Sequence, residues 1–219
     1  MARVNSLLLK GLSGKIGDLS FRTQNGKTFV NLANRRKPRT SSPAMQNHQE
    51  RFRIMIKFIQ PIVPLINLTN KNPGKRRSPF NFIFSENVKA AISGYYPALE
   101  INFAKVILSK GSLPSGERVK LSSREKDKIV IRWIHNRVSI KNHTEDIAFV
   151  ACYHEQRKSW VYEIGLSSRK EGRCSLSTTR FYPGQVHIYF GFHSAKSGLS
   201  SNSLYLGKID MPSPHPKPK

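Results

Sequence analysis

The sequence predicts a mainly β protein with an α-helical N-terminal part: a β-hairpin and two helices, followed by an immunoglobulin- or fibronectin-III-like β-sandwich. Three observations support this prediction. An Asn-Gly pair joins two β-rich runs near the N-terminus, helical periodicity follows, and short β-rich runs then recur along the rest of the chain. We place a basic hairpin-plus-helices region at residues 1–99, the sandwich at 100–210 and a disordered Pro/Lys-rich tail at 211–219.

The N-terminal hairpin is expected from residues 16–23 and 28–32, joined through Asn25 and Gly26. An Asn-Gly pair supplies the two positive φ values that a type I′ turn requires. A two-stranded hairpin is marginally stable by itself, so we expect it to pack on further structure.

The first helix is expected after the basic linker, with a serine or threonine among residues 40–42 as its cap and Pro43 in its first turn. Apolar residues at helical spacing predict the face by which it packs: Met45, Phe52, Met55, Ile56 and Ile59. Pro61 and Pro64 are expected to end this helix. A second helix is expected from Ser78 or Ser85 to residue 92, before Gly94.

The sandwich is expected from about seven short β-rich runs separated by polar turns, several of which alternate apolar and polar residues. Trp133 should fill the core between the two sheets. Tyr182, followed by Pro-Gly, should form the corner that leads into the sixth strand, and residues 203–209 should pair beside that strand.

The net charge of +24 is the largest deviation from an ordinary composition, and residues 1–77 carry 16 Lys/Arg against Asp18 and Glu50. Solubility needs a net charge of only about 2–8 on a small domain. The excess predicts a polyanion as partner, DNA or RNA, held through its phosphates without strong sequence specificity. We expect the two basic loops and the helix between them to form one phosphate-binding surface. Its candidate residues are Arg35, Arg36, Lys37, Arg39, Arg51, Arg53, Lys57, Lys75, Arg76 and Arg77.

Two alternatives remain open for these cations. Each basic run taken singly is typical of a solvated face or loop. The chain can also be a structural or interaction protein, such as a phage-like assembly component, whose hairpin and helix dock a protein partner or a second copy. The fold does not decide between these functions.

No catalytic or metal site is predicted. The seven histidines form no His-x-His or His-x-x-x-His pair. Cys152 and Cys174 are expected to be reduced thiols, with a disulfide as the alternative if the fold brings them together. The glycines of GLSGKIG lack the Gly-Lys-Ser/Thr ending of a phosphate-binding P-loop. We therefore expect a protein that is not an enzyme and has no cofactor. No run approaches the roughly 18 apolar residues of a membrane span, so we expect a cytoplasmic protein without a membrane partner.

Five segments resemble a family of Bacteroidota proteins known only as a domain of unknown function: GLSGKIGDLSFRTQNGK (11–27), PRT…Q…ERF (38–52), ILSKGSLP (107–114), VHIYFGF (186–192) and NSLYLGKI (202–209). The resemblance extends over nearly the full length of the chain. It implies a hairpin-plus-helix region followed by a sandwich, and it implies no catalytic residues.

Overall fold

The computed structural model describes residues 2–4, 9, 11–33, 42–71, 77–125, 128–134, 144–178 and 181–211. The chain divides into two units, Met1–Ser41 and Ser42–Lys219, which are described separately below. The boundary predicted between residues 99 and 100 falls inside the second unit. Of the tail predicted at 211–219, residues 212–219 lie outside the described residues.

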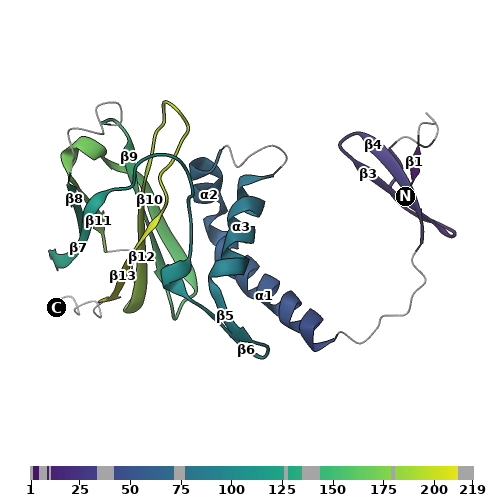
Figure 1. Ribbon diagram of the computed structural model, residues 1–219, viewed down its shortest axis with the longest axis horizontal. Helices are drawn as coiled ribbons and strands as arrows, with labels where there is room; N and C mark the ends of the chain where they lie inside the picture. The colour runs from purple at the N-terminus through teal and green to yellow at the C-terminus, as the bar shows by residue number, and fades with distance from the viewer. Residues whose placement is uncertain are drawn as a thin grey trace, which may run out of the picture. The chain divides into compact units, whose positions relative to one another are not determined.

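The first unit contains a small antiparallel sheet (Figure 1) with strand order β1-β4-β3-β2. The strands are β1 (Ala2–Val4), β2 (Gly14–Ile16), β3 (Leu19–Gln24) and β4 (Lys27–Leu32). The predicted hairpin is confirmed as β3–β4, with Asn25 at φ 51° and Gly26 at φ 70° in its turn. The hairpin gains a further strand on each edge, which supplies the support that two strands alone lack.

The β-sandwich of the second unit is built from two antiparallel sheets, with strand orders β11-β8-β7 and β10-β9-β12-β13. Its strands are β7 (Glu117–Glu125), β8 (Lys128–Ile134), β9 (Ile147–His154), β10 (Ser159–Ser168), β11 (Arg173–Ser177), β12 (Gly184–His193) and β13 (Leu204–Met211). The fourth strand of the sandwich, β10, pairs with the third, β9. The predicted fold class is therefore confirmed.

The core between the two sheets contains Trp133, as the sequence predicts. Trp133 is 5% exposed and packs against Phe190 and Phe192, with ring centroids 5.2 and 5.3 Å away. Its indole N–H donates a hydrogen bond to Arg169 O at 2.8 Å. The one polar group of this buried ring, its N–H, therefore has a hydrogen-bond partner.

The corner before β12 is held by its backbone and not by its tyrosine ring. The Tyr182 side chain is 51% exposed, and the guanidinium of Arg157 lies over its ring. Nε2 of His154 lies 3.2 Å from Tyr182 O and 3.0 Å from Pro183 O. Strand β13 pairs with β12 as predicted.

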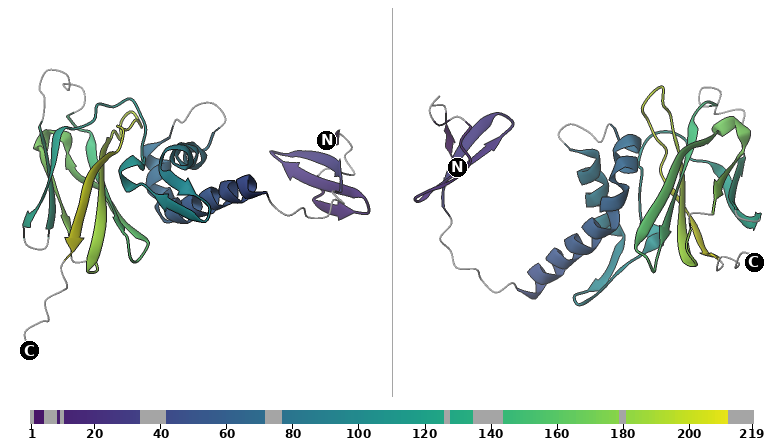
Figure 2. Two further views of the ribbon diagram at one scale, coloured as in Figure 1. Left: turned by 60° about the horizontal axis from the view of Figure 1, so that its bottom comes forward. Right: turned by 180° about the vertical axis from the view of Figure 1, so that it is seen from behind.

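Helices cover the outer face of the β10-β9-β12-β13 sheet, as Figures 1 and 2 show. They are α1 (Pro43–Ile59), the 3-10 turn η2 (Gln60–Ile62), α2 (Val63–Thr69) and α3 (Pro79–Ala90). Ser42 caps α1 and Ser78 caps α3, each followed by a proline in the first turn. As predicted, α1 ends just before Pro61. The helical stretch nevertheless continues, because Pro61 and Pro64 each occupy the first turn of a new helical segment, where the missing N–H of proline breaks no hydrogen bond.

The packing face predicted for α1 is only partly right. Met55 and Ile59 are buried together with Phe58, whereas three other predicted members are exposed: Met45 by 54%, Phe52 by 38% and Ile56 by 42%. The C-terminal half of α1 contacts the sheet, and Trp160 of β10 donates a hydrogen bond to Phe58 O at 2.7 Å. The N-terminal half, which holds Met45, extends past the sheet (Figure 1). Phe52 and Ile56 belong to the C-terminal half and lie beside the buried residues of the helix, not among them.

Two buried asparagines fasten the chain after the helices to α2 and α3. The Asn87 amide donates to Ile107 O and accepts from Ile107 N, and Asn70 does the same for Leu108 O and Lys110 N. Between α3 and this segment lie the hairpin β5 (Ile92–Tyr95) and β6 (Ala98–Ile101) and the 3-10 turn η3 (Phe103–Lys105). The predicted second helix therefore ends at Ala90, and Ile92 begins a strand.

The helical stretch Pro43–Thr69 is, within the described part of the chain, the one helix long and apolar enough to cross a membrane. It meets these criteria because its prolines do not interrupt it. Ile59, Ile62 and Leu65 are fully buried in the core shared with the sheet. A core helix requires this apolar character as much as a membrane helix does, so the absence of a membrane partner stays a prediction.

We predict that two isoleucines of α1 differ sharply in their contribution to stability. Ile59→Ala leaves a cavity in the helix–sheet core and should lower the free energy of unfolding by about 2–5 kcal/mol. Ile56→Ala, three residues earlier and 42% exposed, should change it by less than about 0.5 kcal/mol. Urea unfolding followed by circular dichroism measures both. Equal losses would contradict the packing face described here.

Candidate nucleic-acid interface

The described cations of the first unit lie on one face of its sheet. In the register of β1, β4 and β3, Phe29 stands directly between Arg3 and Arg22. Residues paired across antiparallel strands point to the same face, and the face alternates along each strand. Lys27 is two residues from Phe29, and Lys15 pairs with Ser20, which is two residues from Arg22. Arg3, Lys15, Arg22 and Lys27 therefore share one face.

These four cations are all exposed, and Phe29 among them is partly exposed. The acid of this unit, Asp18, lies in the turn between β2 and β3. One carboxylate cannot neutralise four cations, so the face keeps a positive field.

The opposite face of the same sheet is apolar and carries the loop before β2. Phe21 is buried there, and Thr28 is 1% exposed. The loop is fixed by two hydrogen bonds, from Gly11 N to Thr28 Oγ1 at 2.9 Å and from Thr23 Oγ1 to Leu12 O at 3.0 Å. The two faces of the sheet are thus chemically distinct.

Six of the ten predicted phosphate-binding residues lie outside the described residues: Arg35, Arg36, Lys37, Arg39, Lys75 and Arg76. The convergence of the two basic loops stays a prediction for this reason. The remaining four are Arg51, Arg53, Lys57 and Arg77.

Arg51 serves the fold. Its Nη2 donates hydrogen bonds to Val88 O at 2.9 Å and to Ile92 O at 3.2 Å. The first of these carbonyls belongs to the last turn of α3, where backbone oxygens have no helical partner. Arg51 thus ties α1 to the end of α3 and to β5.

Arg53 and Lys57 lie four residues apart on the exposed side of α1. Nη2 of Arg53 is 2.7 Å from the Glu50 carboxylate, and this hydrogen bond raises the pKa of the guanidinium. Arg77 is exposed immediately before the cap of α3. These three side chains remain accessible to a ligand.

The cationic face of the N-terminal sheet is a feature that the sequence analysis missed. The signal was present, because the two-residue Asn25-Gly26 turn sets the pairing of Lys27 with Gln24 and of Phe29 with Arg22. Lys15 was predictable in the same way, because Gly17-Asp18 forms a two-residue turn between β2 and β3. Arg3 was not, since no turn signal joins β1 to the hairpin.

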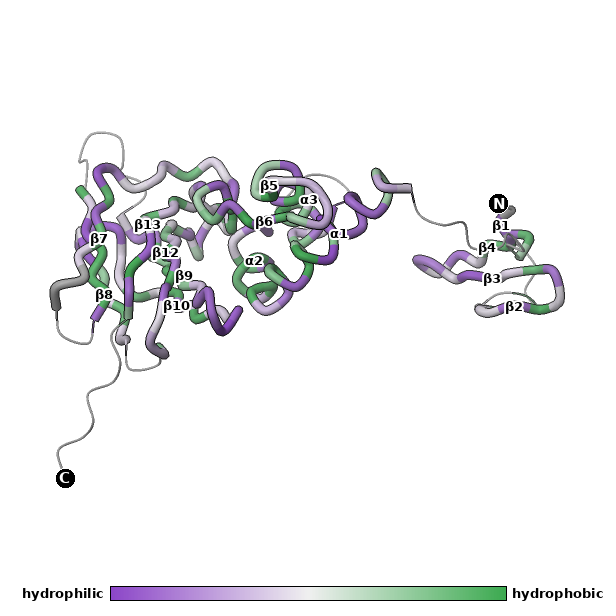
Figure 3. Tube along the Cα trace, turned by 90° about the horizontal axis from the view of Figure 1, so that it is seen from below, coloured by the Kyte–Doolittle hydropathy of each residue, from purple (hydrophilic) through white to green (hydrophobic). Residues whose placement is uncertain are grey.

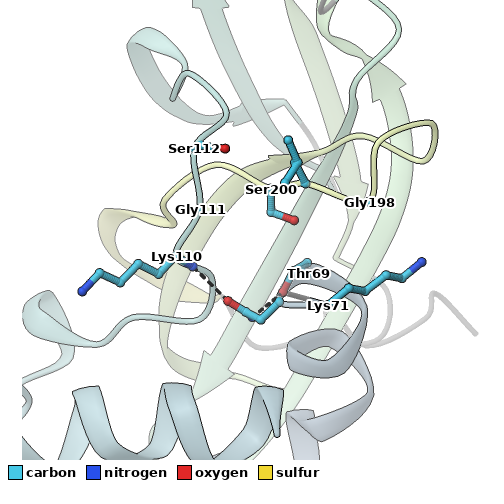
Figure 4. Close-up of a pocket in the computed structure, with 9 residues that line it drawn as sticks. Thr69, Lys71, Lys110, Gly111, Ser112, Gly198 and Ser200 are labelled. Carbon is cyan, nitrogen blue, oxygen red and sulfur yellow. Dashed lines mark hydrogen bonds between the residues drawn. The ribbon is translucent and has the colours of Figure 1, made fainter. Parts of the chain in front are cut away.

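A cavity of about 150 Å³ lies among the end of α2, residues 110–112 and residues 198–200 (Figure 4). The side chains of Lys71 and Lys110 point away from it on opposite sides, and Nζ of Lys110 pairs with Glu86. The Asn70 amide, which also lines the cavity, is hydrogen-bonded to the backbone of Leu108 and Lys110. The cavity therefore presents no converging charges to a ligand.

Ser200 at the edge of this cavity is hydrogen-bonded to His193, with Oγ 2.9 Å from Nδ1. Both residues are 2% exposed, and burial lowers the pKa of His193. A nucleophile needs access to its substrate, so we interpret the pair as structural: it joins the end of β12 to the chain before β13.

Buried ionisable groups elsewhere also serve the sandwich. Arg169 is 1% exposed, stacks on Phe192 and lies 3.4 Å from the Asp146 carboxylate. Cys152 and Cys174 are free thiols in the same core, and burial raises the pKa of Cys174 to about 12. No group of three metal-ligating side chains converges in the ranges that the structure describes. The absence of enzymatic activity stays a prediction.

We predict that Arg51→Ala lowers stability without weakening phosphate binding. Loss of the guanidinium leaves two backbone carbonyls unpaired, which should lower the free energy of unfolding by about 1–3 kcal/mol. The matched variant Arg53→Ala, two residues away and exposed, should leave the unfolding midpoint unchanged. Urea unfolding and binding to an oligonucleotide, measured on both variants, test this. Weaker binding by a fully stable Arg51→Ala protein would contradict the structural role.

The comparisons with known proteins show the family of this chain. None of the curated proteins compared matches it. The model of DUF6266, a family of unknown function, matches residues 11–207 and so covers both units from the loop before β2 into β13. This match confirms the predicted relation to an uncharacterised family: the chain belongs to DUF6266.

Proposed function

We propose that the protein binds nucleic acid through its phosphates, without strong sequence specificity and without catalysing a reaction. The observation that carries this proposal is the one-sided placement of Arg3, Lys15, Arg22 and Lys27 on the N-terminal sheet. The apolar opposite face confines charged side chains of the strands to this face, and all four of them are cations, which solubility alone does not require.

The net charge of the whole chain adds to the positive field of this face. It has 37 Lys and Arg against 13 Asp and Glu, so at least 24 cations have no carboxylate to balance them. The predicted linker cations Arg35, Arg36, Lys37 and Arg39 follow β4 directly in the sequence. They extend the positive charge of the same unit.

Such a surface binds by releasing the cations condensed on the nucleic acid. Each neutralised phosphate steepens the dependence of affinity on salt, and phosphate contacts position a protein without reading bases. Arginine is suited to these contacts, because its planar fork matches phosphate oxygens.

We predict strong binding to DNA and RNA at about 50 mM salt and a steep loss as salt rises, measured by fluorescence anisotropy. Changing Arg35, Arg36, Arg76 and Arg77 together to Ala should weaken binding and reduce the salt dependence. A control with the same loss of charge changes four exposed lysines of the second unit instead: Lys105, Lys120, Lys196 and Lys208. The control should retain most of the affinity. If the wild-type protein does not bind nucleic acid at low salt, the proposal is wrong.

A second candidate function, docking of a protein partner or a second copy, is favoured by the exposed apolar stripe of α1. Met45, Phe52 and Ile56 lie on one side of this helix and are 54%, 38% and 42% exposed. They follow the helical period, with spacings of seven and four residues. An apolar stripe of this kind can fill a groove on another chain.

If the stripe is a docking surface, we expect a defined oligomer or a co-purifying protein that survives nuclease treatment and high salt. Phe52→Glu and Ile56→Glu together should abolish that assembly, because burying carboxylates in an apolar contact is costly. Light scattering on both proteins is the measurement. A monomer with no recovered partner would exclude this candidate.

A further inference from the structure

We propose that the cationic face of the N-terminal sheet is a binding surface for single-stranded nucleic acid, with Phe29 as the platform on which a base stacks. The proposal rests on the nucleic-acid binding proposed above and names the form of nucleic acid. Arg3, Lys15, Arg22 and Lys27 would hold the backbone around that base.

The first step of the argument is the position of the ring. Arg3, Phe29 and Arg22 form one row across three adjacent strands. Neighbouring strands lie about 4.8 Å apart, so the two arginines flank the ring at about 10 Å from each other. A base stacked on Phe29 would have an arginine on either side of it, within reach of the adjoining phosphates.

The second step is the accessibility of the ring. The apolar face also carries an aromatic residue, Phe21, but its side chain is only 8% exposed and is buried in the core of the unit. Phe29 points to the opposite face and remains partly exposed among four exposed cations. On the apolar side, Gly11 and Leu12 of the loop before β2 are hydrogen-bonded to Thr28 and Thr23. Phe29 is thus the aromatic ring that this cationic face offers.

The third step separates single strands from duplexes. In a duplex the faces of the bases are covered by their neighbours, so a protein ring has nothing to stack on without forcing the helix open. A single strand exposes its bases, and stacking on an aromatic side chain is tolerant of sequence because every base has a π face. A ring surrounded by cations therefore favours single strands, whereas cations alone favour any polyanion.

Anisotropy with a labelled dT oligonucleotide and with a duplex of equal length tests this on the full-length protein. Phe29→Leu, which keeps an apolar side chain but loses the ring, should weaken binding to the single strand by about 5- to 100-fold. It should change duplex binding by less than about twofold, since phosphate contacts persist. Phe29→Trp, which keeps a ring, should retain the single-strand affinity.

A second pair of variants tests the role of the arginines. Changing Arg3 and Arg22 together to Gln should make the plot of log affinity against log salt concentration less steep. For single-strand binding its slope should fall in magnitude by about 0.7 for each lost phosphate contact. Changing exposed Lys105 and Lys120 of the second unit to Gln removes the same charge and should leave that dependence unchanged.

The outcomes distinguish this inference from the function on which it rests. No binding to either nucleic acid at about 50 mM salt overturns both. Tight binding that Phe29→Leu leaves unchanged overturns the stacking surface alone and leaves phosphate binding standing. The stacking surface is also overturned if the protein binds vesicles containing phosphatidylserine and Phe29→Leu weakens that binding as much as it weakens single-strand binding. The ring would then be inserting into a lipid surface.

Discussion

The fold depends on a sheet that is buried on both faces. In β9, Ala148, Val150 and Cys152 face the other sheet of the sandwich, while Phe149, Ala151 and Tyr153 face the helices. In β12, successive side chains likewise face the other sheet and the helices in turn. Because residues on both faces of β9 and β12 pack in a core, neither strand shows the polar alternation of a half-exposed sheet. Figure 3 colours the chain by hydropathy. The helices are therefore a third layer of the sandwich, and the two cores share these strands.

Close packing in this shared sheet also restricts individual positions. A Cβ on Gly191 would lie 2.5 Å from the ring of Phe149, so the helix-facing side of β12 has no room for a side chain there. Asn70 and Asn87 satisfy backbone groups of residues 107–110 that would otherwise be buried without partners. Arg51 does the same for the end of α3. Polar residues inside this unit are thus explained by the fold, which leaves the exposed cations to be explained by something else.

Local signals predicted local structure well. The Asn25-Gly26 turn specified a hairpin and its register, and short β-rich runs separated by polar turns identified the strands of the sandwich. Long-range choices were not predictable in the same way. The periodicity of α1 shows which residues share a side but not which part of that side the neighbouring elements cover, so Phe52 was placed in the core with Ile59. The same limit applies to the site: Arg51 and Arg53 look alike in sequence, and only the position of α3 separates a structural arginine from an exposed one.

Excess charge and stability act against each other in this chain. A net charge of +24 repels itself and opposes a compact state. Burial of apolar side chains on both faces of one sheet opposes that repulsion, and it does not depend on salt in the way that charge does. Salt therefore has two effects of opposite sign: it screens the repulsion, which stabilises the fold, and it weakens any contact with phosphates. We therefore expect loss of binding at high salt to come from the weakened phosphate contacts and not from unfolding, because screening of the self-repulsion favours the folded state.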